Sequence, residues 1–120
     1  EGNKPKKEQQ KAVYQDVSVE EFKSKMEQTE GTVLDVRTPG EVAQGVIPDA
    51  VHINIYDQDF AERAAQLDKD KPVYVYCKVG GRSSKAGHQL IEMGFKEVYN
   101  LDGGITAWNG SGNETVELEK

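Results

Sequence analysis

The only cysteine of the chain, Cys77, stands where an apolar strand pattern gives way to a polar run that contains glycines. Residues 73–76 are β-branched or aromatic and predict a buried strand, and the apolar spacing from Ala86 to Ile91 predicts a helix. A thiol between a parallel strand and a helix faces backbone N–H groups and the positive end of the helix dipole. This setting favours the thiolate, which is the nucleophilic form of cysteine.

The residues that follow Cys77 suit an anion cradle with a nucleophile at its floor. Lys78 and Arg82 supply positive charge, and two glycines between them let the backbone curl without a Cβ penalty. A lone cysteine is more often an inert, buried hydrophobe, but that interpretation fits a cysteine between apolar neighbours better than this one. For Lys78, a solvated surface position is as good an interpretation as a role in the cradle. Ser83 and Ser84 are interpreted as caps of the following helix.

Composition limits the classes of function. The chain has 120 residues, 36% of them apolar, which is enough for one domain with a single core. No apolar run approaches the roughly 18 residues of a membrane span, so we expect none. A formal charge of −6 argues against nucleic acid as a partner. One cysteine and two histidines exclude an internal disulfide and disfavour a Cys/His zinc site, so we expect no metal and no cofactor.

Short strand patterns alternate with helix patterns along the chain, which predicts an α/β domain with a mostly parallel sheet of about five strands. Strands are expected at 12–17, 33–36, 51–55, 73–76 and 98–101, and helices after Ser18, at 57–67, at 83–93 and around 105–108. Ligands of such sheets bind beyond the carboxyl ends of the strands, so the turn at 103–104 is expected beside the Cys77 loop.

Two charged residues and one histidine near the other strands have structural interpretations. Asp35 falls inside an apolar strand, so it needs a partner, and Arg37 or nearby loop amides are available. Both are interpreted as structural first, with substrate contact as the alternative. His52 alternates with apolar residues, which favours a packing or surface position over a general base. Trp108 is expected in the core or the site wall.

The two ends of the sequence are polar. We predict a disordered tail over residues 1–12, one domain over 13–110 and a polar tail over 111–120. The sequence begins without Met, and a polar lead-in of this kind follows a cleaved export signal. We therefore expect an exported, for example periplasmic, protein, with a cytoplasmic location as the alternative.

Four stretches resemble the rhodanese family of single-domain sulfurtransferases, in the expected order and spacing, over about Val17 to Trp108. They are Leu34–Glu41, Gly45–Ala50, Val75–Ser83 and Gly94–Trp108. Many relatives have His where this chain has Val46, Gly where it has Asp49, and an aromatic residue where it has Val42. The resemblance implies a rhodanese-like three-layer fold, in which helices flank a central, mostly parallel sheet.

The resemblance also implies an enzyme of the thiosulfate:cyanide sulfurtransferase class. Cys77 would be the catalytic nucleophile that carries a sulfane sulfur as a persulfide, from thiosulfate or polysulfide to cyanide, a thiol or a protein acceptor. The residues implied to bind the anionic donor are those of the loop: Lys78, Val79, Gly80, Gly81 and Arg82. No cofactor is implied, and a monomer or weak dimer is expected.

Two other functions fit the same loop. One is a sulfur carrier or binding module in a relay, which the sequence separates poorly from an enzyme. The other is a phosphatase or arsenate reductase of the same fold. From Cys77 to Arg82 the loop has six residues, and the resemblance implies one residue more in those enzymes, which accommodate a tetrahedral oxyanion. We therefore rank sulfur transfer first.

Overall fold

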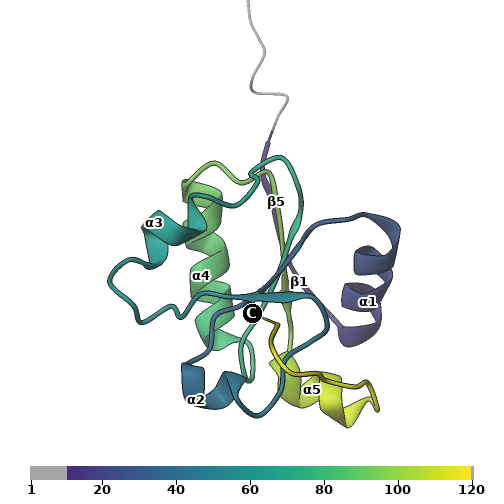
Figure 1. Ribbon diagram of the computed structural model, residues 1–120. Helices are drawn as coiled ribbons and strands as arrows, with labels where there is room; N and C mark the ends of the chain where they lie inside the picture. Colours follow the sequence, from purple (N-terminus) through teal and green to yellow (C-terminus); the bar gives the residue numbers. More distant parts are fainter. Residues whose placement is uncertain (1–10, 120) are drawn as a thin grey trace, which may run out of the picture.

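A computed structural model describes residues 11–119 and shows a five-stranded, fully parallel sheet (Figure 1). Its strands are β1 (Val13–Val17), β2 (Thr32–Asp35), β3 (Ala50–His52), β4 (Val73–Tyr76) and β5 (Glu97–Leu101). They lie in the order β1-β5-β4-β2-β3, so β4 is central and β1 is an edge strand. The predicted α/β class and the number of strands are confirmed.

Helices cover both faces of this sheet, which confirms the three-layer arrangement. They are α1 (Val19–Gln28), α2 (Pro39–Val42), α3 (Phe60–Ala64), α4 (Gly81–Glu92) and α5 (Gly104–Gly110). Figure 1 shows α3 and α4 on one side of the sheet and α1 and α5 on the other, in agreement with two separate apolar clusters.

The central strand β4 is buried on both faces. Val73 and Val75 join the apolar cluster of α3 and α4, whereas Tyr74 and Tyr76 join the cluster of α1 and α5. The Tyr74 hydroxyl donates to the carbonyl oxygen of Thr29 at 2.6 Å. An uninterrupted apolar and aromatic run is typical of a parallel strand covered by helices on both sides. This placement makes the carboxyl end of β4 the centre of the sheet edge.

Two elements differ from their sequence predictions. The strand expected over 51–55 ends at His52, because the Asn54 side chain accepts the N–H of Tyr56 at 3.0 Å and turns the chain away. The helix expected over 57–67 is regular only over α3, with turns on either side. The S-x-x-E pattern at Ser18 caps α1 through one hydrogen bond, from the Glu21 N–H to Ser18 Oγ at 3.2 Å.

Of the predicted N-terminal tail, residues 1–10 lie outside the described residues. The C-terminal segment follows α5 back along the domain, where Val116 and Val46 form an antiparallel bridge with both N···O distances at 2.8 Å. The Trp108 indole N–H also donates to the Glu114 carbonyl oxygen at 2.9 Å. The domain boundaries stay predictions. Within residues 11–119, no helix has the length and apolar character needed to cross a membrane.

Candidate active site

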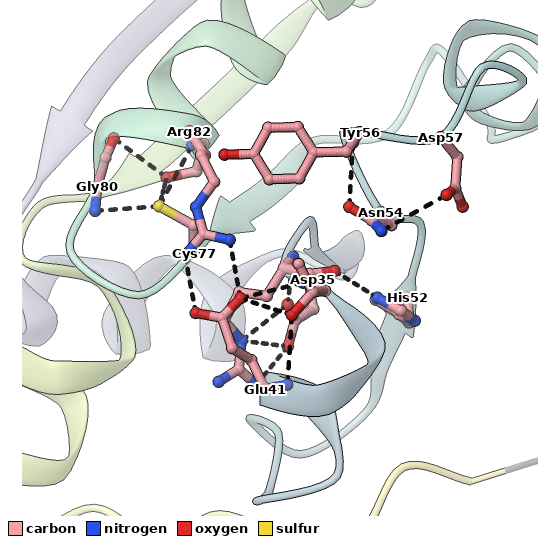
Figure 2. Close-up of polar contacts among 12 residues, drawn as sticks. Asp35, Glu41, His52, Asn54, Tyr56, Asp57, Cys77, Gly80 and Arg82 are labelled. Carbon is pink, nitrogen blue, oxygen red and sulfur yellow. Dashed lines mark hydrogen bonds and ion pairs between the residues drawn. The ribbon is translucent and has the colours of Figure 1, made fainter.

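Cys77 lies directly after β4, at the carboxyl end of the central strand, and a short loop joins it to α4. Its Sγ accepts hydrogen bonds from the Gly80 N–H at 3.1 Å, the Ser83 N–H at 3.4 Å and the Ser83 hydroxyl at 3.3 Å. Figure 2 shows the sulfur enclosed by this loop. The residue is only 1% exposed, so the thiol is held at the floor of the loop.

The electrostatic setting of Cys77 is a balance of two opposing effects. Burial alone raises the pKa of the thiol, because it removes water from the charged form. The hydrogen bonds from the Ser83 hydroxyl, and from the N–H groups of Ser83, Gly80 and Val79, lower it. Their combined effect is larger, and the pKa of Cys77 is lower than that of a free thiol. The loop therefore stabilises a thiolate.

Glycine is required at two positions that shape the loop. Gly80 has φ +113°, a left-handed conformation that L side chains rarely adopt. A Cβ on Gly104 would lie 2.3 Å from the Lys78 carbonyl oxygen. The N–H groups of Ile105 and Thr106 donate to the carbonyl oxygens of Cys77 and Lys78 at 2.9 and 3.1 Å. The turn before α5 thus lies against the loop, as the sequence predicts.

The predicted donor-binding residues face different directions. The N–H groups of Val79 and Gly80 point to the sulfur, whereas the Val79 side chain is 62% exposed. Lys78 is also exposed, and among the described residues it forms no ion pair. Gly81 is the first residue of α4. Binding of a donor by these residues stays a prediction.

Arg82 is held by Glu41, a contact that sequence reasoning missed. Its NH1 and NH2 groups donate to the two Glu41 carboxylate oxygens at 2.8 and 2.9 Å (Figure 2). Glu41 also accepts the Thr38 N–H and hydroxyl, both at 3.1 Å, in a capping box at the start of α2. The Arg82 guanidinium lowers the pKa of Glu41 to about 2. The pair is therefore fully charged at neutral pH.

Two further polar residues support the loop and were not identified from the sequence. Ser83, interpreted as a helix cap, is fully buried and bonds the reactive sulfur. Asn100 is 3% exposed, and its Nδ2 donates to the Gly80 carbonyl oxygen at 3.2 Å and to Asp16 at 2.9 Å. The only available signal was a polar residue within the apolar pattern of β5.

The charged pair at the end of β2 is buried and hydrogen-bonded, as predicted. Arg37 NH2 lies 2.7 Å from Asp35 Oδ2, and the Arg37 N–H and Nε also bond this carboxylate. Both residues are buried. His52 Nε2 lies 2.6 Å from the Arg37 carbonyl oxygen, which agrees with a packing role. The described residues contain no group of His, Cys, Asp and Glu that could hold a metal ion.

Comparison with known proteins identifies relatives in both sequence and fold. The family model described as "Rhodanese-like domain" matches residues 18–111. A protein named sulfurtransferase from Allochromatium vinosum is 38% identical over 87% of this chain and 96% of its own length. YtwF of Bacillus subtilis is 44% identical, over 79% of this chain and 90% of its own length.

A third relative and a solved structure extend the comparison. The thiosulfate sulfurtransferase GlpE of Coxiella burnetii is 40% identical over 63% of this chain and 69% of its own length. The crystal structure of a rhodanese-related protein from Thermoplasma volcanium superimposes with a TM-score of 0.75 at 31% identity. That match covers 86% of this chain and 98% of the solved one.

Proposed function

This chain belongs to the rhodanese-like domain family, and from that membership we propose that it is a sulfurtransferase whose Cys77 carries a sulfane sulfur as a persulfide. The observation that carries the proposal is the convergence of hydrogen-bond donors from Gly80 and Ser83 on the sulfur of the only cysteine. One relative named sulfurtransferase, and another named thiosulfate sulfurtransferase, support the same class of reaction.

The first half-reaction loads the cysteine. The Cys77 thiolate attacks the outer sulfur of thiosulfate, a bond forms between the two sulfur atoms, and the S–S bond of the donor breaks. Sulfite leaves with the electron pair of that bond, so the reaction needs neither an oxidant nor a proton. The donors that stabilise the thiolate, chiefly the N–H of Gly80 and the N–H and hydroxyl of Ser83, are placed to stabilise the persulfide anion as well.

The second half-reaction discharges the cysteine. Cyanide, or the thiolate of a small molecule or protein, attacks the outer sulfur of the persulfide. The Cys77 thiolate then leaves, and the product is thiocyanate or a new persulfide. The chain has a single cysteine, so no second thiol of the same chain can accept the sulfur. Two half-reactions through one covalent intermediate predict ping-pong kinetics.

The burial of Cys77 favours donors with a terminal sulfur. The residue is 1% exposed, so a reactant must reach the floor of a six-residue loop. A terminal sulfur of thiosulfate, a polysulfide or a persulfide is a single atom at the end of the donor. A phosphate ester would have to place a tetrahedral group there, which supports sulfur transfer over phosphatase chemistry.

Intact mass spectrometry tests the proposal directly. After incubation with thiosulfate, the protein is expected to gain about 32 Da, the mass of one sulfur held on the nucleophile. Brief treatment with cyanide should remove it, and Cys77→Ser should show no gain. A protein that gains sulfur but does not lose it to cyanide or thiols would be a carrier. No gain with thiosulfate, polysulfide or a small persulfide rejects sulfur transfer and leads to tests with phosphate esters and arsenate.

The pH dependence of alkylation tests the role assigned to the loop. The pKa of Cys77 is lowered, so alkylation by iodoacetamide should reach half its maximal rate at a lower pH than alkylation of a free thiol measured in parallel. Ser83→Ala removes the hydroxyl that bonds the sulfur, and its midpoint should lie at higher pH. Ser84→Ala is the neighbouring control, because the Ser84 hydroxyl bonds Tyr14 and not the sulfur. An unchanged midpoint in Ser83→Ala would exclude this role.

A further inference from the structure

The charge available to a donor at the reactive loop is smaller than the sequence suggests. Lys78 and Arg82 are both cations of the loop, but only Lys78 lies exposed. The Arg82 guanidinium donates two hydrogen bonds to Glu41, and the two side chains are 23% and 27% exposed. A carboxylate at this distance cancels most of the field of the guanidinium for any third charge nearby.

Other contacts hold the Glu41 side chain in the position from which it binds Arg82. Glu41 is fixed from behind by the Thr38 N–H and hydroxyl, and Pro39 begins the same short helix. Its carboxylate therefore loses little side-chain entropy when it binds Arg82, unlike an ordinary surface pair. Figure 2 shows the pair beside Cys77, with the Tyr56 hydroxyl directed toward Arg82 from the other side.

Two hollows of the surface flank this pair. The charged residues that line one of them, of about 180 Å³, are Glu41, Lys78 and Arg37, and Arg37 is neutralised by Asp35. The other, of about 290 Å³, is lined by Arg82, Tyr56 and Lys85. A donor that approaches the loop from either hollow passes one member of the pair. The net charge of Glu41 and Arg82 together, rather than that of Arg82 alone, therefore acts on it.

On the basis of the proposed sulfurtransferase function, we propose that Glu41 is a specificity-determining residue that favours singly charged organic persulfides over dianionic thiosulfate as sulfur donors. A dianion gains twice as much as a monoanion from a nearby positive charge, so cancelling the charge of Arg82 penalises thiosulfate more. The persulfide reaction is balanced in the same way. The Cys77 thiolate bonds the outer sulfur of RSS⁻, the donor S–S bond breaks, and RS⁻ leaves with the electron pair of that bond, so that the outer sulfur stays on Cys77 as the persulfide anion.

The test is a ratio of efficiencies. We would measure kcat/KM, with cyanide as the acceptor, for thiosulfate and for 2-hydroxyethyl persulfide, and divide the first value by the second. In Glu41→Gln this ratio should rise about three- to tenfold. Thiosulfate carries one more negative charge than the persulfide, and this is the effect expected when that extra charge meets an uncancelled Arg82 in partly hydrated surroundings. In Arg82→Gln, which leaves Glu41 uncompensated, the ratio should fall.

The double variant Glu41→Gln/Arg82→Gln tests most directly whether the net charge of the pair sets the ratio. Its pair is neutral, as in the unmodified protein, so the ratio should return to the original value even if both rates are lower. Glu20→Gln is the matched control, because Glu20 is exposed on α1, on the opposite face of the sheet from α4, and loses the same charge. Its ratio should not change.

The outcomes separate the two proposals. If the ratio does not follow the charge of the pair, or if Glu41→Gln changes both efficiencies equally, the role of Glu41 is rejected while the sulfurtransferase function stands. If Glu41→Gln does not fold, Arg82→Gln and Glu41→Asp decide, since the first should lower the ratio and the second should preserve it. If the unmodified protein transfers sulfur from neither donor, the proposed function itself fails.

Discussion

Two arginine–carboxylate pairs in this molecule have similar chemistry and opposite surroundings. Asp35 and Arg37 are two residues apart, and their side chains are 0% and 5% exposed. Glu41 and Arg82 are 41 residues apart and about a quarter exposed, beside the reactive loop. The first pair fixes the chain where it leaves β2, and the second joins α2 to α4. Burial confines the first pair to a structural role, whereas partial exposure beside the reactive loop leaves the second pair accessible to a ligand.

Asp35→Asn should have the largest effect on the free energy of unfolding. It would leave the Arg37 guanidinium buried without a negative partner, and breaking a buried pair in this way costs about 3–5 kcal/mol. Urea unfolding followed by circular dichroism measures the loss. Asp70→Asn is the control, because Asp70 is 77% exposed in its pair with Lys96. Equal losses in the two variants would show that burial does not set the value of the Asp35 pair.

Arg82→Gln should cost less stability, about 1 kcal/mol, because water still reaches both members of its pair. The same urea experiment measures this loss. Arg63→Gln provides a control in a looser pair, in which Arg63 and Asp57 are 3.6 Å apart and both 45% exposed. If Arg82→Gln is as damaging as Asp35→Asn, the pair at the loop is structural as well, and the contrast between the two pairs is lost.

Acid should weaken the Glu41–Arg82 pair in a defined pH window. The pKa of Glu41 is about 2 in the folded chain and 4.5 ordinarily. A carboxylate with a depressed pKa contributes stability that is fully present above pH 4.5 and is lost as the pH falls through about 2. The difference in unfolding free energy between the unmodified protein and Glu41→Gln should therefore shrink between pH 5 and pH 2.5. A difference that stays constant or grows would contradict the assignment.

Added salt should produce the smallest of these effects, and it should weaken the Glu41–Arg82 pair more than the Asp35–Arg37 pair. At 1 M salt the Debye length is about 3 Å, so partly exposed charges are screened and buried ones are screened much less. A double-mutant cycle should show the Glu41–Arg82 coupling energy falling by a few tenths of a kcal/mol between low and high salt. The Asp35–Arg37 coupling energy should change less. A larger change for Asp35–Arg37 than for Glu41–Arg82 would contradict the assignment of the first pair as buried and the second as partly exposed.

The sequence by itself determined what depends on near neighbours in the chain. The apolar run of β4, the single cysteine after it and the glycines beyond it predict the reactive loop without knowledge of any other strand. The Asp35–Arg37 pair was predictable for the same reason, because Arg37 follows only two positions after Asp35, just beyond the end of a strand that had to be buried. The α/β class follows from the alternation of the patterns.

Only the tertiary structure decided which distant residues complete the site. Because β2 and β4 are neighbours in the sheet, the chain that leaves their carboxyl ends brings Glu41 of α2 to Arg82 of α4. Likewise β5 lies beside β4, which places Asn100 under the Gly80 carbonyl. No local pattern fixes the order of five parallel strands, since each could pair with any other through its main-chain groups. The partner of Arg82, and with it the net charge beside the sulfur, became visible only once that order was known.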